Sequence, residues 1–198
     1  MNNPLDYFKI SQHNKSVFKN NLIYSNKKKK IILLEFNRLS SSIISYSYLA
    51  NILQKKYNSE IFAYRLTAKK NKLKDLLWKI FSKIKIFNTF QVYDSFGAKS
   101  FINPQSTYLK PQYLKKIKNI KKNINSKNDL LNLKIDKIYI GDLIYDSYLM
   151  NYKKPTIDLN DRSFTFFLDH SLKTFFQWKE IFKKYDVKSV IVSHSVYT

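Results

Sequence analysis

The sequence predicts an α/β protein built on a mostly parallel, Rossmann-like sheet with helices on both faces. Residues 31–36 and 59–66 have the composition of buried strands, and residues 43–57 between them have that of a helix. A strand, a helix and a second strand in this order form a βαβ unit, which requires a parallel sheet with a right-handed crossover. Residues 187–192, which are rich in valine, continue the alternation of strands and helices.

The first strand segment, IILLEF, is apolar almost without interruption, as expected for a parallel strand buried on both faces. Ser40, Ser41 and Ser42 come shortly after it, and serine is a favoured residue at the start of a helix. We therefore expect a helix to begin there and to reach about Tyr57. The segment SEIFAYRL then supplies the second strand.

Residues 72–87 form the clearest amphipathic pattern in the chain. Their apolar residues fall within an arc of roughly 140° at about 100° per residue, and lysines flank this arc. One interpretation is a helix that packs on the sheet with its lysine stems lying along apolar surface. The other is a surface helix that touches an anionic membrane. The apolar residues of the arc are Leu73, Leu76, Leu77, Ile80, Phe81, Ile84 and Phe87.

The remaining segments continue the α/β pattern. Residues 92–105 contain Gly97 and a short strand at 100–102, and residues 112–133 are helical and rich in lysine, which indicates an exposed segment. We predict a strand at 137–141, one or two helical turns after it, and a long aromatic-rich helix at 162–185 with Asp161 as a possible cap.

We expect two parts in the chain: a loosely structured lead-in at 1–26, and one Rossmann-like domain at 27–198. The final strand is followed by only a few residues, whereas a parallel α/β unit normally continues with a covering helix. This pattern predicts a truncated fold, the front part of something longer.

The charge is a weak indication of a partner. The formal net charge is +22, but of the 36 basic residues only Arg38, Arg65 and Arg162 are arginine. Bidentate recognition of bases and phosphates favours arginine. Abundant lysine, asparagine and isoleucine with only 2 glycines is also what A/T-rich codons produce. We attribute the charge to a solvated surface and do not expect nucleic acid as a partner.

Other classes are excluded by what the chain lacks. With no cysteine there is neither a disulfide framework nor a thiolate zinc site, and 3 histidines without close carboxylate spacing do not predict a metal site. The N-terminus has no signal-peptide pattern and no apolar run approaches the ~20 residues of a membrane span. We expect a soluble, cytoplasmic protein. No G-x-S-x-G, Walker A or G-x-G-x-x-G pattern indicates a hydrolase, a P-loop enzyme or a dinucleotide enzyme.

Candidate site residues follow the predicted strands, because ligands of open parallel sheets bind beyond the carboxyl ends of the strands. Three strand ends are rich in polar groups. The residues are Glu35 and Asn37 at the first end, Gly141, Asp142, Tyr145 and Asp146 at the second, and Ser193, His194 and Ser195 at the third.

The second strand end raises two alternatives. Gly141 lets the backbone turn sharply or lets a ligand come close to main-chain atoms, and Asp142 then becomes an N-cap. Asp142 and Asp146 lie on one helix face, where they could bind sugar hydroxyls or where one could act as a general base. The alternative is ordinary helix capping by Asp142 and a lysine partner for Asp146.

His194 follows the last strand and lies between two serines, which makes it a better candidate for a base than His13 or His170. A histidine that is merely hydrogen-bonded in place is the alternative. Ser193 and Ser195 do not make a catalytic triad with it by adjacency, because triads assemble in space.

Several stretches resemble bacterial surface-polysaccharide (capsule-type) biosynthesis proteins, which are similar to GT-B glycosyltransferases. They are YSYLANIL, SFGAKSFI, IGDLIYDSYL with KPTIDL, and VIVSHSVYT, within about residues 30–198. The resemblance implies two Rossmann-like halves, with acceptor recognition in the first and a nucleotide-sugar donor mainly in the second. The chain would then be the acceptor-side half without its donor-binding domain, which puts donor binding and independent activity in doubt.

By this resemblance, Asp142, Tyr145, Asp146 and His194 would line the cleft, and Asp142 or His194 would deprotonate the acceptor hydroxyl. The expected partners are a glycan or lipid-linked glycan acceptor and, through residues 72–87, the inner face of an anionic membrane. We expect no cofactor bound by this chain itself. Two alternatives are a non-catalytic module that binds RNA or anionic lipid, and an inactive gene fragment.

Overall fold

The computed structural model describes residues 4–18, 30–36, 40–64 and 89–192. The chain divides into two compact units, which we describe separately. The first unit comprises residues 1–106 and 181–193, and the second comprises residues 107–180 and 194–198. Residues 27–198, which we expect to form a single domain, contribute to both units, and the helical second unit has its own core.

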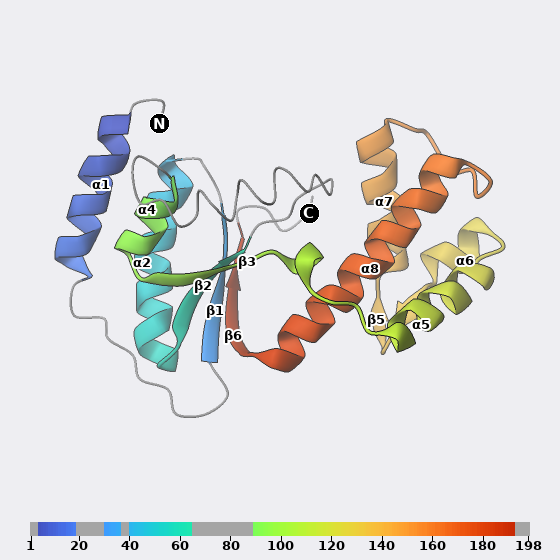
Figure 1. The fold of residues 1–198 in the computed structure, drawn as a ribbon. Coiled ribbons are helices and arrows are strands. Elements are labelled where there is room, and N and C mark those ends of the chain that lie inside the picture. Colours follow the sequence, from blue (N-terminus) through green and yellow to red (C-terminus); the bar gives the residue numbers. More distant parts are fainter. Residues whose placement is uncertain (1–3, 19–29, 37–39, 65–88, 193–198) are drawn as a thin grey trace. The chain divides into compact units, whose positions relative to one another are not determined.

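The first unit contains the predicted parallel sheet. Its strands are β1 (Lys30–Glu35), β2 (Glu60–Tyr64), β3 (Ala98–Ile102) and β6 (Asp186–Ile191). They are arranged in the order β3-β2-β1-β6, and every neighbouring pair is parallel (Figure 1). The prediction of a Rossmann-like α/β fold is confirmed.

Two helices pack on one face of this sheet, α2 (Ser40–Tyr57) and α4 (Thr89–Ser95). Alternate residues of β1, Ile32 and Leu34, contribute to the core beneath them, while Ile31 and Leu33 are completely buried on the opposite face. Burial on both faces explains why this strand is apolar almost throughout. The helix residues of the core are Ile43, Tyr46 and Ala50 from α2 and Val92, Tyr93 and Phe96 from the segment of α4.

The N-terminal lead-in is not loosely structured throughout, because α1 (Pro4–Val17) is a helix. Its two buried residues in the described part are polar, Ser11 and Asn14, and Asn14 Nδ2 donates to Ser95 Oγ of α4 at 3.2 Å; Ile10 is only partly buried against the core. A helix that packs through serine and asparagine lacks the apolar periodicity by which a helix is predicted. This is why the sequence did not indicate it.

The second unit is mainly helical. It contains α5 (Pro111–Lys122), α6 (Lys127–Leu131), α7 (Gly141–Tyr152) and most of α8 (Arg162–Lys184) (Figure 1). The core lies among these helices and includes a stacked pair of rings, Tyr113 and Phe176, whose centroids are 4.7 Å apart. The other buried members are Ile117, Leu130, Ile135, Ile140, Ile144, Tyr148, Phe164, Leu168 and Leu172.

A strand lies within the predicted range 137–141, but the expectation that it belongs to the parallel sheet is wrong. The strands β4 (Lys134–Ile135) and β5 (Ile138–Tyr139) pair with each other as a short antiparallel hairpin. Asp136 and Lys137 at its turn have φ values of 51° and 71°, the combination that a two-residue hairpin turn requires. The turn contains no glycine, so the usual sequence signal of such a hairpin is missing.

Side chains cap two helices of the second unit. Asp161 Oδ1 accepts a hydrogen bond from the backbone N–H of Ser163 at 2.8 Å, which confirms Asp161 as the cap of α8. The helical stretch predicted at 112–133 is divided into α5 and α6 by a break at 123–126. There, Ser126 and Asp129 form a reciprocal capping box.

The amphipathic segment at 72–87 lies outside the described residues. Within the described ranges, no helix is both long enough and apolar enough to cross a membrane.

Candidate functional site at the carboxyl edge of the sheet

The carboxyl ends of the four parallel strands lie at one edge of the sheet. From β1 the chain adds β2 and β3 on one side, while β6 pairs with β1 on the other side, with Leu34 opposite Ile191. Ligands of open α/β sheets bind where the strand order reverses in this way. The reversal lies between β1 and β6, beside Glu35.

Glu35 is half-buried and ends β1. The hydroxyl of Tyr46 on α2 donates to its Oε2 at 3.5 Å, and the hydroxyl of Tyr93 on α4 donates to its backbone carbonyl at 3.0 Å. Tyr64 lies opposite Glu35 in the register of β1 and β2. We call these four residues, Glu35, Tyr46, Tyr64 and Tyr93, the edge cluster.

Tyr64 is held in its neutral form. Its side chain is 4% exposed, and burial raises the pKa of its hydroxyl well above the ordinary range, with further contributions from the charge of Glu35 and from Tyr46. Its backbone carbonyl accepts a hydrogen bond from the N–H of Phe36 at 2.7 Å, which extends the pairing beyond β1. The hydroxyl therefore stays protonated and can donate a hydrogen bond at neutral pH.

Aromatic rings adjoin the edge cluster. The ring of Phe36 lies 5.0 Å from that of Tyr93 and 6.0 Å from that of Phe101 on β3, measured between centroids. Phe36 and Phe101 are both only partly buried. Both rings lie beside Tyr93 of the edge cluster and add partly exposed apolar surface there.

This arrangement is suited to a ligand with many hydroxyl groups. A carboxylate accepts hydrogen bonds from hydroxyls, while neutral phenols can both donate and accept. The edge cluster contains one carboxylate and no cation, so it does not favour a phosphate. Rings beside such polar groups give apolar contact to the C–H faces of a bound molecule.

The second predicted strand end lies in the other unit, and Gly141 has a packing role there. Gly141 is buried as the first residue of α7. A Cβ atom on it would overlap the carbonyl oxygen of Leu130 and approach that of Leu131 to 2.9 Å, both on α6. Close approach of two backbones, rather than of a ligand, accounts for the glycine.

Asp142 and Asp146 are both exposed on α7. The prediction that Asp142 is the N-cap is wrong: Ile140 occupies that position, and Asp142 Oδ1 instead accepts from the N–H of Leu143 at 2.8 Å. Asp146 lies one helical turn further on. The two carboxylates therefore share a helix, as predicted, and neither forms an ion pair with another residue in the described part of the chain.

Tyr145 lies beside these carboxylates on α7. Hydrogen bonds from Lys127 and then Thr156 lower the pKa of its hydroxyl, and the Lys127 ammonium lies 4.6 Å from the centroid of its ring. This part of α7 therefore combines two carboxylates with a phenol that a lysine polarises.

The other predicted site residues, Asn37, Ser193, His194 and Ser195, lie outside the described residues. The structure thus groups Gly141, Asp142, Tyr145 and Asp146 on one helix and places Glu35 at the edge of the sheet in the other unit. Among the residues that the structure describes, no group of three or more metal-binding side chains occurs.

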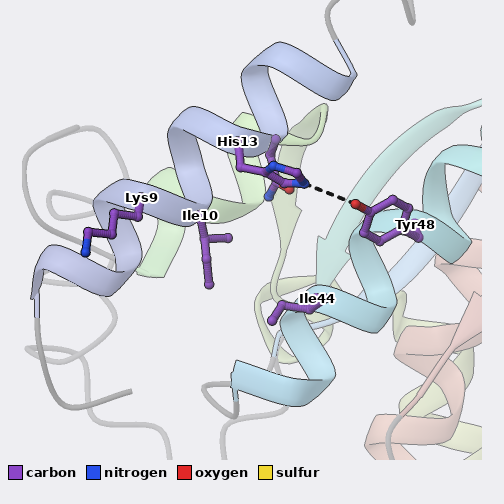
Figure 2. Close-up of a pocket in the computed structure, with 6 residues that line it drawn as sticks. Lys9, Ile10, His13, Ile44 and Tyr48 are labelled. Carbon is purple, nitrogen blue, oxygen red and sulfur yellow. Dashed lines mark hydrogen bonds between the residues drawn. The ribbon is translucent and has the colours of Figure 1, made fainter.

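Neither of two surface hollows is lined by residues of the edge cluster. One, of about 300 Å³, lies between α1 and α2, where Lys9, Ile10 and Ile44 line it (Figure 2). At its rim His13 Nε2 and the hydroxyl of Tyr48 are 3.1 Å apart (Figure 2). The other, of about 440 Å³, lies between α5 and α8 in the second unit and is lined mainly by lysines.

The three tyrosines of the edge cluster were not predicted from the sequence. Tyr64 is the last residue of β2, as Glu35 is the last residue of β1. Pairing the two predicted strands end to end would have indicated Tyr64 as a neighbour of Glu35. Tyr46 and Tyr93 come from helices, and only the packed fold brings their hydroxyls to Glu35.

No family model matches this chain, and no curated protein or solved structure matches it either.

Proposed function

We propose that the chain is the acceptor-side part of a glycosyltransferase-like enzyme in bacterial cell-surface polysaccharide biosynthesis. The observation that supports this most is the edge cluster at the point where the strand order reverses. A carboxylate among neutral phenols, beside half-buried aromatic rings, has the chemistry of a sugar site. The sequence stretches that resemble capsule-type biosynthesis proteins point to the same class.

In this proposal the edge cluster binds a glycan acceptor. Glu35, the half-buried member of the cluster, accepts hydrogen bonds from sugar hydroxyls, and the buried phenol of Tyr64 stays protonated beside it. Phe36 and Phe101 contact the C–H face of the sugar ring. Asn37, Ser193 and Ser195 follow the two adjacent strands in sequence and supply further hydrogen bonds.

For an acceptor at the edge cluster, His194, which follows β6 in sequence, is the proposed base; for an acceptor bound on α7 of the second unit, Asp142 is the proposed base. Asp142 is exposed near the start of α7, with Tyr145 and Asp146 as further hydroxyl ligands. The donor is a nucleotide sugar that a second, donor-binding part would hold. The protein would work in the cytoplasm, at the inner face of the membrane.

Titration calorimetry with oligosaccharides from bacterial surface polysaccharides tests acceptor binding. Glu35→Gln keeps the shape of the side chain and removes its charge, so we expect affinity to fall by about tenfold, the loss of one charge-assisted hydrogen bond. Glu60→Gln is the matched control, because Glu60 begins β2 at the opposite edge of the same sheet and pairs with Lys99. Equal losses in both variants, or no binding by the unaltered protein, would refute the proposal.

The choice of base is tested by transfer. With a donor-binding partner and a labelled nucleotide sugar, either Asp142→Asn or His194→Ala should abolish product formation while leaving acceptor binding intact. Full activity in both variants would remove both residues from the mechanism.

A further inference from the structure

The outer surface of α2 is unusual for a helix that covers a sheet. Its exposed residues fall on one arc of roughly 140° at about 100° per residue. Four of them are large and apolar, with 45%, 44%, 45% and 63% of Ile44, Tyr48, Leu49 and Ile52 exposed. We call this surface the α2 arc; its members are Ile44, Ser45, Tyr48, Leu49, Ile52, Lys55 and Lys56.

The inner side of the same helix is packed against the first unit. Ile43, Tyr46 and Ala50 pack into the core of the first unit. Asn51, also buried, donates to the carbonyls of Ser47 and Phe96 at 2.8 and 3.0 Å. The apolar residues of the arc are not members of this core. Ile44 and Tyr48 border α1, where the Tyr48 hydroxyl lies 3.1 Å from His13 Nε2 and its ring 5.5 Å from that of Phe18, but all four residues remain at least 44% exposed. A contiguous exposed apolar surface of this kind marks an interaction site.

The charge on this surface has one sign. α2 contains no Asp or Glu, and its last turn carries Lys55 and Lys56. Across the hollow between α1 and α2, Lys9 adds a further exposed cation beside Ile10 and Ile44 (Figure 2). A partner that covers the arc must therefore accept aliphatic side chains and carry negative charge.

We propose that the α2 arc docks on the surface of an anionic phospholipid membrane. Ile44, Leu49 and Ile52 enter the boundary between headgroups and acyl chains, and the lysines lie at the level of the lipid phosphates. Tyr48, an amphipathic aromatic side chain, suits the same boundary. This partner does not depend on whether the edge cluster binds a glycan.

Two other occupants fit less well. A second copy would bring Lys55 and Lys56 against a face of the same sign, which is unfavourable. A nucleic acid would gain from the lysines but not from Ile44, Leu49 and Ile52, which can neither stack on a base nor form a hydrogen bond with one.

Co-sedimentation of the 198-residue chain with vesicles tests the proposal. We expect it to bind vesicles of mixed phosphatidylcholine and phosphatidylglycerol, to bind pure phosphatidylcholine far less, and to dissociate as salt rises. Leu49→Ser with Ile52→Ser should weaken binding at least tenfold, and Lys55→Gln with Lys56→Gln by about 30-fold.

Matched control variants are available in the second unit. Leu143→Ser with Met150→Ser removes two apolar side chains that are 62% and 56% exposed on α7. Lys118→Gln with Lys122→Gln removes two exposed lysines of α5. Both double variants should keep most of the vesicle binding. If the control variants lose as much vesicle binding as the α2 variants, the binding is due to net charge or to non-specific hydrophobic adsorption. The docking site is then refuted.

Three further outcomes would overturn the proposal. One is concentration-dependent dimerisation that Leu49→Ser with Ile52→Ser abolishes, since the occupant is then a second copy. Another is a fall in Tm of more than about 5 °C in that variant, since the arc is then covered within the chain. The third is tight binding of single-stranded RNA that the α2 lysine variant alone removes.

Discussion

The start of α7 packs so tightly against α6 that no side chain fits at Gly141 beside the carbonyl oxygen of Leu130. A single methyl group there would require the two helices to separate. The glycine therefore has a structural reason, and chemistry on α7 must come from the residues that follow it.

Gly141→Ala should destabilise the second unit by about 3 kcal/mol, because overpacking against a backbone relaxes poorly. Denaturant unfolding at neutral pH measures this. Ser147→Ala, on the same helix, is the control and should stay within about 0.5 kcal/mol of the unaltered protein. An unchanged stability for Gly141→Ala would mean that α6 and α7 are not in contact as described.

Asn51→Ala should destabilise the first unit by about 2 kcal/mol. Its amide donates to the carbonyls of Ser47 and Phe96, and the loss of a buried donor leaves Phe96 without this hydrogen bond. Asn132→Ala serves as the control in a urea titration, because the Asn132 amide also donates to a carbonyl four residues earlier but is exposed. Equal effects for both variants would contradict the buried network.

Asp161 should make stability depend on pH in the acid range. Hydrogen bonds from the backbone and then the side chain of Ser163, and from Tyr148, lower the pKa of its carboxyl. Its contribution to the free energy of unfolding is present above about pH 4, the unfolded value, and is lost as pH falls through the lower folded pKa. The unaltered protein should therefore be more stable than Asp161→Asn at neutral pH and converge with it on acidification. A constant difference at all pH values would rule out this carboxylate as the cause.

Tyr64 should have the opposite dependence. Because its folded pKa is raised, its contribution is fully present below the unfolded value of about 10 and is lost as pH rises towards the folded pKa. Absorbance of tyrosinate in the folded protein should therefore rise equally in Tyr64→Phe and in the unaltered protein around pH 10. After denaturation in urea, the tyrosinate absorbance of the unaltered protein should exceed that of Tyr64→Phe by the contribution of one tyrosine. A difference already present in the folded proteins would show that Tyr64 is accessible.

The parts of the fold that follow from local pattern were predictable. The apolar segments that became β1 and β2, and the serine-initiated helix between them, fix the parallel sheet and its edge. From that edge, Glu35 could be chosen as a site residue.

What escaped prediction depends on contacts between distant segments. The role of Gly141 depends on Leu130, and the contacts of Tyr46 and Tyr93 with Glu35 depend on the packing of α2 and α4. The hairpin at 134–139 was mistaken for a parallel strand, because a short apolar run has no period that separates the two. The helix α1 was missed because its two buried residues in the described part are polar.

The most direct test of a glycan site at the carboxyl edge is to map where an acceptor binds. A photo-crosslinking oligosaccharide from a surface polysaccharide is irradiated with the protein, and its attachment sites are identified by mass spectrometry. We expect attachment at the partly exposed rings Phe36 and Phe101, with loss of labelling in Glu35→Gln and in an excess of unlabelled glycan. Attachment confined to the second unit, or labelling that Glu35→Gln leaves unchanged, would contradict the site.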